Sequence, residues 1–142
     1  MGYRLFVFDL DETLWCEDLE EVCPYHGPFQ LKGHHLATCA TATVRLRRGT
    51  RQLMRSIHNC GGICSLACRG DAEVCGELLD AFGIRDHFFY PRYGLMEKGE
   101  AILEVLKEIE ECLGVEIRPD EVLFVDDAPA NTKEARRIGA AT

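Results

Sequence analysis

The sequence has no long hydrophobic run and is short of positive charge. Its longest early apolar run, Leu5–Phe8, is far shorter than the ~18 residues that a membrane span needs and too short for a signal-peptide core. We therefore expect a cytoplasmic protein. The 16 Lys and Arg residues stand against 24 Asp and Glu, which gives a net charge of −8. This balance argues against nucleic acid, whose phosphate backbone would be repelled, and against an anionic membrane surface.

Internal repeats and low-complexity stretches are also absent from the sequence, and cysteine is too sparse for a disulfide scaffold. The 8 cysteines make up about 6% of the 142 residues, below the density of small secreted disulfide-rich domains. At this length roughly two thirds of the unfolded chain's surface can be buried, so a core can form without obligatory disulfides or metal. We expect a single domain over residues 1–142.

Four short apolar runs, the pattern of strands covered on both faces, alternate with amphipathic segments. The predicted strands are residues 4–8, 63–67, 87–90 and 122–125. The predicted helices are residues 50–60, 71–82, 99–113 and 129–138, each followed by glycine. The first helix presents Leu53, Met54, Ile57 and Cys60 on one face. Such alternation predicts right-handed crossovers, and so an α/β fold with a small doubly wound parallel sheet.

An insertion of about 35 residues, at about 14–48, interrupts this alternation and is longer than an ordinary loop. Residues 41–46 alternate so that Ala42, Val44 and Leu46 fall on one side, as in a half-buried strand. We interpret the insertion as a small β lid after the first strand. A further strand would normally follow the last helix, where only residues 140–142 remain. The sheet therefore either lacks an edge there or the sequence has been trimmed.

The loops that leave the carboxyl ends of parallel strands converge on one crevice. Here those loops carry Asp9, Asp11, Cys68, Arg69, Gly70, Lys98, Asp126 and Asp127. Like charges cost about 4 kcal/mol per pair at 4 Å, even with an effective dielectric near 20, so we expect a bound cation. Oxygen ligands suit Mg²⁺, one ion per chain. With a carboxylate nucleophile and a lysine, these are the groups required for phosphoryl transfer through an aspartyl-phosphate.

Residues 6–14, FVFDLDETL, resemble the DxDxT signature of the haloacid dehalogenase superfamily of phosphatases. Leu14-Trp15, the turn at 68–69, Lys98, and residues 124–127 (FVDD) with Asn131 resemble, more narrowly, the magnesium-dependent phosphatase family within it. The resemblance covers nearly the whole chain except the insertion. It implies a Rossmann-type fold of that superfamily and a magnesium-dependent hydrolase of phosphate monoesters.

The resemblance also implies roles for the matching residues. Asp9 would be the nucleophile and a metal ligand. Asp11 would protonate the leaving oxygen and then activate the hydrolytic water, while its main-chain carbonyl binds the metal. Lys98 would neutralise the phosphoryl oxygens and the nucleophile. Asp126 and Asp127 would hold the metal, and Asn131 would lie near the same loop. Cys68, Arg69, Gly70 and Thr13 would bind the substrate, and Thr13 would also hold the loop geometry.

Position 68 departs from the family pattern, which places Ser or Thr there to donate a hydroxyl hydrogen bond to a phosphoryl oxygen. The thiol of Cys68 is a poorer donor, and the amides of Arg69 and Gly70 would then carry most of the phosphate binding. We hypothesise a working site that is sensitive to oxidants, because oxidation of this thiol would block phosphate.

The insertion carries six potential zinc ligands: Cys16, Cys23, His26, His34, His35 and Cys39. Their spacing matches no standard zinc finger, so structural zinc, disulfides and ordinary packing or surface roles stay open. A basic stretch, comprising Arg45, Arg47, Arg48, Arg51 and Arg55, either steers phosphorylated substrates to the crevice or forms a solvated face.

Two other functions compete with the aspartate mechanism. Residues 39–45 fit the C-x5-R pattern of cysteine-dependent phosphatases, but they lack glycines that aim amides at phosphate and lie in a predicted strand. A non-enzymatic phospho-accepting or phosphate-binding module of the receiver type also combines acids, lysine and magnesium. In receivers the acid pair comes early and the accepting Asp later, the reverse of this chain. The sequence does not choose between a phosphotyrosine or other phosphoprotein substrate and a sugar phosphate, nor does it give the oligomeric state.

Overall fold

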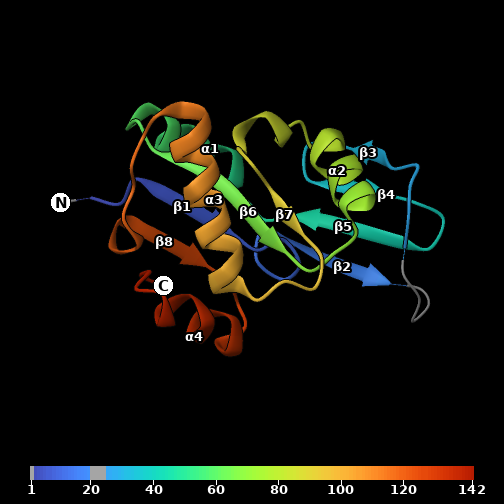
Figure 1. Ribbon diagram of the computed structural model, residues 1–142. Helices are drawn as coiled ribbons and strands as arrows, with labels where there is room; N and C mark the ends of the chain where they lie inside the picture. Colours follow the sequence, from blue (N-terminus) through green and yellow to red (C-terminus); the bar gives the residue numbers. More distant parts are fainter. Residues whose placement is uncertain (1, 20–24) are drawn as a thin grey trace.

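The main sheet is parallel in the computed structural model, which describes residues 2–19 and 25–142. Its strands are β1 (Leu5–Phe8), β6 (Ile63–Cys68), β7 (Arg92–Tyr93) and β8 (Val122–Val125), in the spatial order β7-β6-β1-β8 (Figure 1). The central strand β1 pairs with both β6 and β8, and Phe8 is in register with Leu66 and Val125. The carboxyl ends of these three strands therefore lie side by side.

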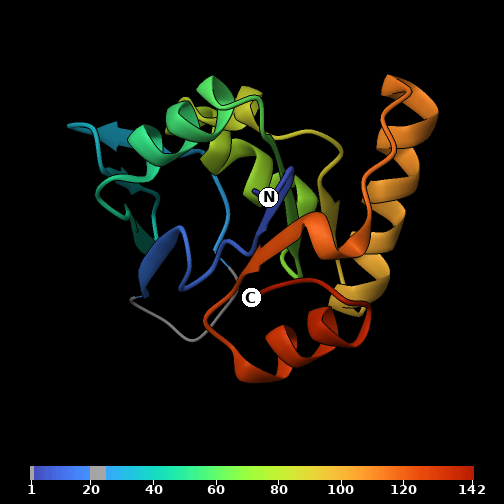
Figure 2. The same cartoon turned by 90° about the vertical axis from the view of Figure 1, so that its left-hand side faces the viewer.

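Helices cover both faces of this sheet. The helices α1 (Thr50–Asn59) and α2 (Ala72–Ala81) pack on one face, and α3 (Lys98–Leu113) and α4 (Pro129–Arg137) pack on the other (Figure 2). Successive residues of β1 divide between the two cores, because side chains of a strand alternate: Phe8 packs toward α2, and Leu5 and Val7 pack toward α3. The predicted doubly wound α/β fold is confirmed.

Local signals in the sequence set the helix ends. The carboxylate of Asp71 caps α2 by accepting a hydrogen bond from the Glu73 amide, with an N···O distance of 2.7 Å. Gly114 ends α3 in the left-handed conformation, with φ 68°, which glycine adopts without steric cost. Pro129 begins α4, where its missing amide proton removes no helical hydrogen bond. The four predicted helices agree with the structure to within one residue at each end.

The third predicted strand, residues 87–90, is wrong. Residues Arg85–His87 form a 3₁₀ turn, and Phe88 makes only an isolated bridge to Cys64. Tyr90 then adopts a left-handed conformation with φ 51°, and Pro91 has no amide proton to donate. Pairing with β6 is interrupted there and resumes at Arg92.

Two peripheral features also differ from the sequence pattern. Met54 and Ile57 of α1 are buried as predicted, but Leu53 and Cys60 are exposed, because only a narrow stripe of this helix contacts the core. Beyond α4, Ala141 forms a parallel bridge to Leu123 of β8. The edge of the sheet beside β8 is thus extended by a single residue pair.

A second, antiparallel sheet follows β1 in the chain, and we call it the lid sheet. It comprises β2 (Trp15–Leu19), β3 (Gln30–Lys32), β4 (Leu36–Thr38) and β5 (Ala42–Leu46), in the order β2-β5-β4-β3. The alternation in β5 is confirmed, since Ala42, Val44 and Leu46 are buried. No helix in the described part of the chain combines the length and apolar character of a membrane span.

Candidate active site

Three carboxylates meet at the carboxyl ends of two neighbouring strands. Asp9 directly follows β1, and its amide donates to the Val125 carbonyl of β8 at 3.0 Å, which holds the two strand ends together. Asp126 and Asp127 directly follow β8. One carboxylate oxygen from each of the three residues lies within 4.8 Å of the others. The structure therefore brings together acids that are 117 residues apart in the sequence.

Lys98 is the cation of this cluster. It is the first residue of α3, and its side chain is only 2% exposed. Its Nζ lies 3.4 Å from Asp9 Oδ1 and 3.8 Å from Asp126 Oδ2, and it also donates to the carbonyl of Ala67 near the end of β6. The backbone amide of Lys98 donates to Glu134 Oε2 of α4 at 2.7 Å. These contacts hold the ammonium at the centre of the sheet edge.

The loop after β8 is held by its own hydrogen bonds. Asp126 is fully buried at its side chain, and its two oxygens accept from the Ala128 amide and from Asn131 Nδ2, each at 2.9 Å. Thr13 Oγ1 lies 3.4 Å from Asp127 Oδ1 and donates to it. Asn131 and Thr13 thus position the acid pair, which is a more specific placement for both than the sequence suggested.

Burial raises the pKa of Asp9 to about 6, because a carboxylate loses hydration in this crevice; Lys98 opposes the rise and Asp126 adds to it. With Lys98 protonated, three ionised carboxylates leave the cluster with an excess of negative charge. A divalent cation would remove that excess.

The donors fit such a cation. They are all hard oxygens, and each Asp126 oxygen keeps a lone pair beyond its one hydrogen bond. Oxygen ligands with few protein carboxylates suit Mg²⁺, which retains water and shares positions with phosphate. The carboxylate of Asp11 does not belong to this cluster in the described part of the chain. Asp9, Asp126 and Asp127 are the side chains that could hold such an ion.

The carboxylate of Asp11 lies beside the cluster and is held by the lid sheet. Trp15 is completely buried, and its indole Nε1 donates to Asp11 Oδ1 at 3.0 Å. Tyr25 donates its hydroxyl to Glu17 Oε1 at 2.8 Å. Burial, followed by hydrogen bonding and charge from Asp11, raises the pKa of Glu17 to about 8. The lid sheet therefore places an indole donor and the carboxyl group of Glu17 near Asp11.

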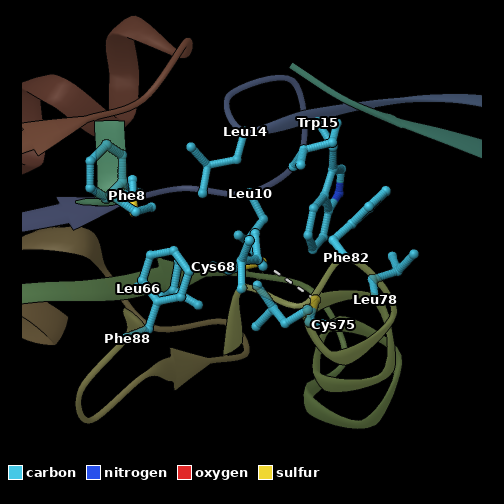
Figure 3. Packing of buried hydrophobic residues seen from close by; sticks show 14 of the residues in the cluster. Phe8, Leu10, Leu14, Trp15, Leu66, Cys68, Cys75, Leu78, Phe82 and Phe88 are labelled. Carbon is cyan, nitrogen blue, oxygen red and sulfur yellow. Dashed lines mark hydrogen bonds between the residues drawn. The ribbon is translucent and has the colours of Figure 1, made fainter. Parts of the chain in front are cut away.

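The loop after β6 carries the predicted phosphate-binding residues. The amide of Gly70 donates to Cys68 Sγ at 3.2 Å, and Cys68 Sγ lies 3.8 Å from Cys75 Sγ in α2 (Figure 3). The hydrogen bond with Cys75 lowers the pKa of the Cys68 thiol, and the Gly70 amide contributes in the same direction. Arg69 forms an ion pair with Glu134 at 3.2 Å, and its side chain is about half exposed. In this structure the charge of Arg69 is therefore directed to α4.

A cavity of about 300 Å³ opens beside Asp11. It is lined by Asp11, the loop after β6, α2 and the segment before β3: Asp11, Tyr25, His26, Gly70, Asp71, Val74 and Cys75. A group bound there would contact Asp11 on one side and the Gly70 loop on the other. The sequence alone does not predict this cavity.

The cysteines and histidines of the insertion do not assemble with the acids. Within residues 2–19 and 25–142, they form no group of three potential metal ligands, and Cys16 and Cys39 are free thiols; Cys23 lies outside the described residues. His26 lines the cavity beside Asp11, whereas His34 and His35 line a separate pocket with Arg47, Arg51 and Arg55. His26 thus lies at a different surface from His34 and His35.

Three site residues were missed by the sequence analysis. Glu134 binds both the Lys98 amide and Arg69, Tyr25 lines the cavity and donates to Glu17, and Cys75 contacts Cys68. None of the three belongs to a sequence motif. The fold alone brings them to the site.

A model of the acid phosphatase family matches residues 3–142. Among solved structures, the crystal structure at 1.7 Å of a candidate phosphatase from Clostridium difficile is similar, with a TM-score of 0.68 and 17% sequence identity. The match covers 99% of this chain and 83% of that one. At this identity the likeness concerns the fold. No curated protein sequence matches the chain.

Proposed function

This chain belongs to the acid phosphatase family, within the haloacid dehalogenase superfamily of phosphatases, and from that membership we propose a magnesium-dependent phosphate-monoester hydrolase that works through an aspartyl-phosphate on Asp9. The observation that carries the proposal is the gathering of Asp9, Asp126 and Asp127 around the buried ammonium of Lys98. The cavity beside Asp11 gives the leaving group a place to lie.

Asp9 is the nucleophile in this proposal. A carboxylate oxygen attacks phosphorus in line, a new P–O bond forms to Asp9, and the ester P–O bond breaks. Lys98, 3.4 Å from Asp9 Oδ1, offsets negative charge on the nucleophile and on the phosphoryl oxygens. Bound Mg²⁺ would supply the further positive charge that lets three carboxylates and a phosphate share one crevice.

Asp11 is the general acid and base in this proposal. It donates a proton to the leaving oxygen in the first half and accepts one from the attacking water in the second. Its Oδ1 is held by the Trp15 indole, while Oδ2 lies on the side of Gly70 and the cavity. That orientation suits a group that must face the bond between phosphorus and the leaving oxygen.

The substrate lies with its phosphate on the loop after β6, where the Arg69 and Gly70 amides and the Cys68 thiol would bind it. The Gly70 amide would exchange its hydrogen bond to Cys68 Sγ for one to the phosphate. Its leaving group occupies the cavity of about 300 Å³, at the small end of the range for ligand pockets. A sugar or a single aromatic ring has a suitable size, so a sugar phosphate and the phosphotyrosine of a phosphoprotein both remain substrates to test. We place this activity in the cytoplasm.

The receiver-type alternative is less well supported because of Asp11. A receiver keeps its phosphoryl group, whereas a second carboxylate beside the accepting aspartate promotes hydrolysis. The thiol mechanism of residues 39–45 leaves the acid cluster without a role. The thiol mechanism predicts activity that survives both chelation and Asp9 substitution. The receiver predicts a stable phosphoryl-protein without turnover.

Turnover of p-nitrophenyl phosphate with Mg²⁺ tests the proposal. We expect activity that EDTA abolishes and Mg²⁺ restores, and a loss of at least about a thousandfold in Asp9→Asn, the scale of removing a nucleophile. Asp120→Asn, at an exposed position away from the site, is the matched control and should retain full activity. Activity that survives both EDTA and Asp9→Asn would sink the aspartate mechanism. A stable phosphoryl-protein without turnover would favour the receiver.

A further inference from the structure

Two buried thiols lie directly behind the phosphate-binding loop. Cys68 is the last residue of β6 and Cys75 lies in the first half of α2; they are 3% and 4% exposed. Their sulfur atoms are 3.8 Å apart and face each other (Figure 3). A disulfide has an S–S bond of about 2.05 Å, so the two sulfurs together need to approach by less than about 2 Å.

The backbone of Gly70 packs against the sulfur atoms of both Cys68 and Cys75. Its amide donates to Cys68 Sγ at 3.2 Å. A Cβ placed on Gly70 would lie 2.9 Å from Cys75 Sγ and 3.3 Å from Cys68 Sγ, so the loop backbone is packed tightly against the pair. Movement of the sulfurs must therefore be transmitted to the backbone that carries the phosphate-binding amides.

A small oxidant has a route to the pair. Cys75 and Gly70 line the same cavity of about 300 Å³ that contains Asp11. The Gly70 amide stabilises a thiolate at Cys68, and the thiolate is the reactive form of cysteine. Hydrogen peroxide is small enough to enter such a cavity, which the substrate would otherwise occupy.

We propose that Cys68 and Cys75 are a redox modification site, and that peroxide converts them into a reversible disulfide that disables the phosphate-binding loop. One thiolate attacks a peroxide oxygen and the O–O bond breaks, which gives a sulfenic acid and, with a proton, water. The second thiol then attacks the sulfenic sulfur, the S–O bond breaks and a second water leaves. Two electrons pass from the two sulfurs to the peroxide, and a thiol reductant reverses the change.

The disulfide displaces the loop. Forming the bond draws the first turns of α2 toward the end of β6, and because the Gly70 backbone is packed against both sulfurs, the Gly70 amide shifts away from the phosphate. The loss of activity rests on the proposed function, whereas the formation of the disulfide does not.

Peptide mapping of the full chain tests the disulfide. The protein is reduced, exposed to hydrogen peroxide, alkylated and digested with trypsin. Cleavage after Arg69 separates the two cysteines, so the disulfide joins the peptides 56–69 and 70–85. Fragmentation of the joined pair distinguishes Cys68 from Cys60 and Cys64 in the same peptide. We expect Cys68 joined to Cys75.

Activity on p-nitrophenyl phosphate is followed in the same samples. We expect at least a tenfold loss after peroxide and recovery with dithiothreitol. Cys75→Ala should give no joined peptide and no loss that dithiothreitol reverses, relative to its own untreated rate. Cys64→Ala is the matched control, since Cys64 is a buried cysteine of the same strand and the same tryptic peptide. It should keep both the joined peptide and the reversible loss.

The outcomes separate the two proposals. Absence of the joined peptide in folded, oxidised protein overturns the modification site, as does an equal reversible loss in Cys75→Ala. A joined peptide with unchanged turnover overturns the regulatory effect. Absence of turnover before oxidation overturns the proposed function, while the peptide map still decides on the disulfide.

Discussion

Trp15 is completely buried, yet it contacts a residue of the candidate active site. Its ring packs against Phe82 at a centroid distance of 5.9 Å, and its Nε1 donates to Asp11 Oδ1 at 3.0 Å. The ring belongs to the core, whereas the N–H group orients Asp11, the residue proposed to transfer the proton. One residue thus connects the core to the candidate active site.

Replacement of Trp15 by Phe separates these two functions. The variant keeps an aromatic ring against Phe82 but loses the donor to Asp11. A hydrogen bond to a charged group is worth about 1.5–3 kcal/mol, so we expect kcat to fall roughly tenfold or more with little change in KM. Steady-state kinetics on p-nitrophenyl phosphate measure the split. Phe82→Leu, which alters the packing but not the hydrogen bond, should lower the melting temperature and spare kcat. A kcat for Trp15→Phe within twofold of wild type would contradict this role.

The site residues differ in how far the sequence could predict them. Asp9, Asp126 and Asp127 could be predicted to meet because each directly follows an apolar strand, and parallel strands end at one edge. Glu134 and Tyr25 could not, since their positions depend on how α4 and the segment before β3 pack against the site. The contact of Cys75 with Cys68 likewise requires the angle of α2 to β6, which no spacing encodes.

At the scale of elements, α3 and α4 position Lys98 through a close approach. A Cβ on Gly99 would lie 2.8 Å from the backbone oxygen of Glu134 and 3.1 Å from Ile138 Cγ2. The neighbouring Lys98 amide binds the Glu134 side chain. Gly99 therefore allows the two helices to approach closely enough for this hydrogen bond.

Gly99→Ala should separate the two helices and displace Lys98. Overpacking costs about 1–3 kcal/mol, and we expect a lower melting temperature together with reduced kcat. Gly76→Ala in α2 is the matched control, because its new Cβ meets only the flexible guanidinium of Arg85 at 3.3 Å. Alanine there should be neutral or stabilise the helix by about 0.5–1 kcal/mol. Thermal unfolding and turnover of both variants give the comparison, and equal behaviour would contradict the close-approach role.

The elements themselves were largely predictable, with one instructive exception. Caps such as Asp71 and terminal glycines such as Gly114 are local signals, so helix ends follow from the sequence. The third strand was misplaced because the apolar run at 87–90 contains a left-handed residue, Tyr90, and precedes Pro91. Apolar character indicates burial, but backbone geometry decides where pairing occurs.

At the scale of the whole molecule, the site lowers the stability of the fold. The pKa of Asp9 rises from 3.8 to about 6 on folding, mainly through burial. A carboxyl group with a raised folded-state pKa binds its proton more tightly in the native protein. Its favourable contribution is present below pH 3.8 and is lost as the pH rises through about 6. Above that pH, the metal-free protein carries the cost of an ionised, buried Asp9.

Asp9→Asn should therefore stabilise the metal-free protein at neutral pH. We expect the free energy of unfolding at pH 8 in EDTA to increase by up to about 3 kcal/mol, and the gain to shrink toward zero near pH 4. Urea unfolding of wild type and variant across this range provides the measurement. Saturating Mg²⁺ should reduce the difference, because the ion stabilises the ionised form. A gain that does not vary with pH would contradict the assignment to Asp9 ionisation.

The acid cluster and part of the cavity wall come from different segments of the chain, which bears on enzyme engineering. The carboxylates and Lys98 belong to the parallel sheet and α3, whereas Tyr25 and His26 come from the insertion and Val74 from α2. A mutant library confined to these three wall positions would vary the shape presented to an incoming molecule while leaving the residues proposed for phosphoryl transfer intact. Directed evolution at these positions could thus change which molecules the cavity accepts.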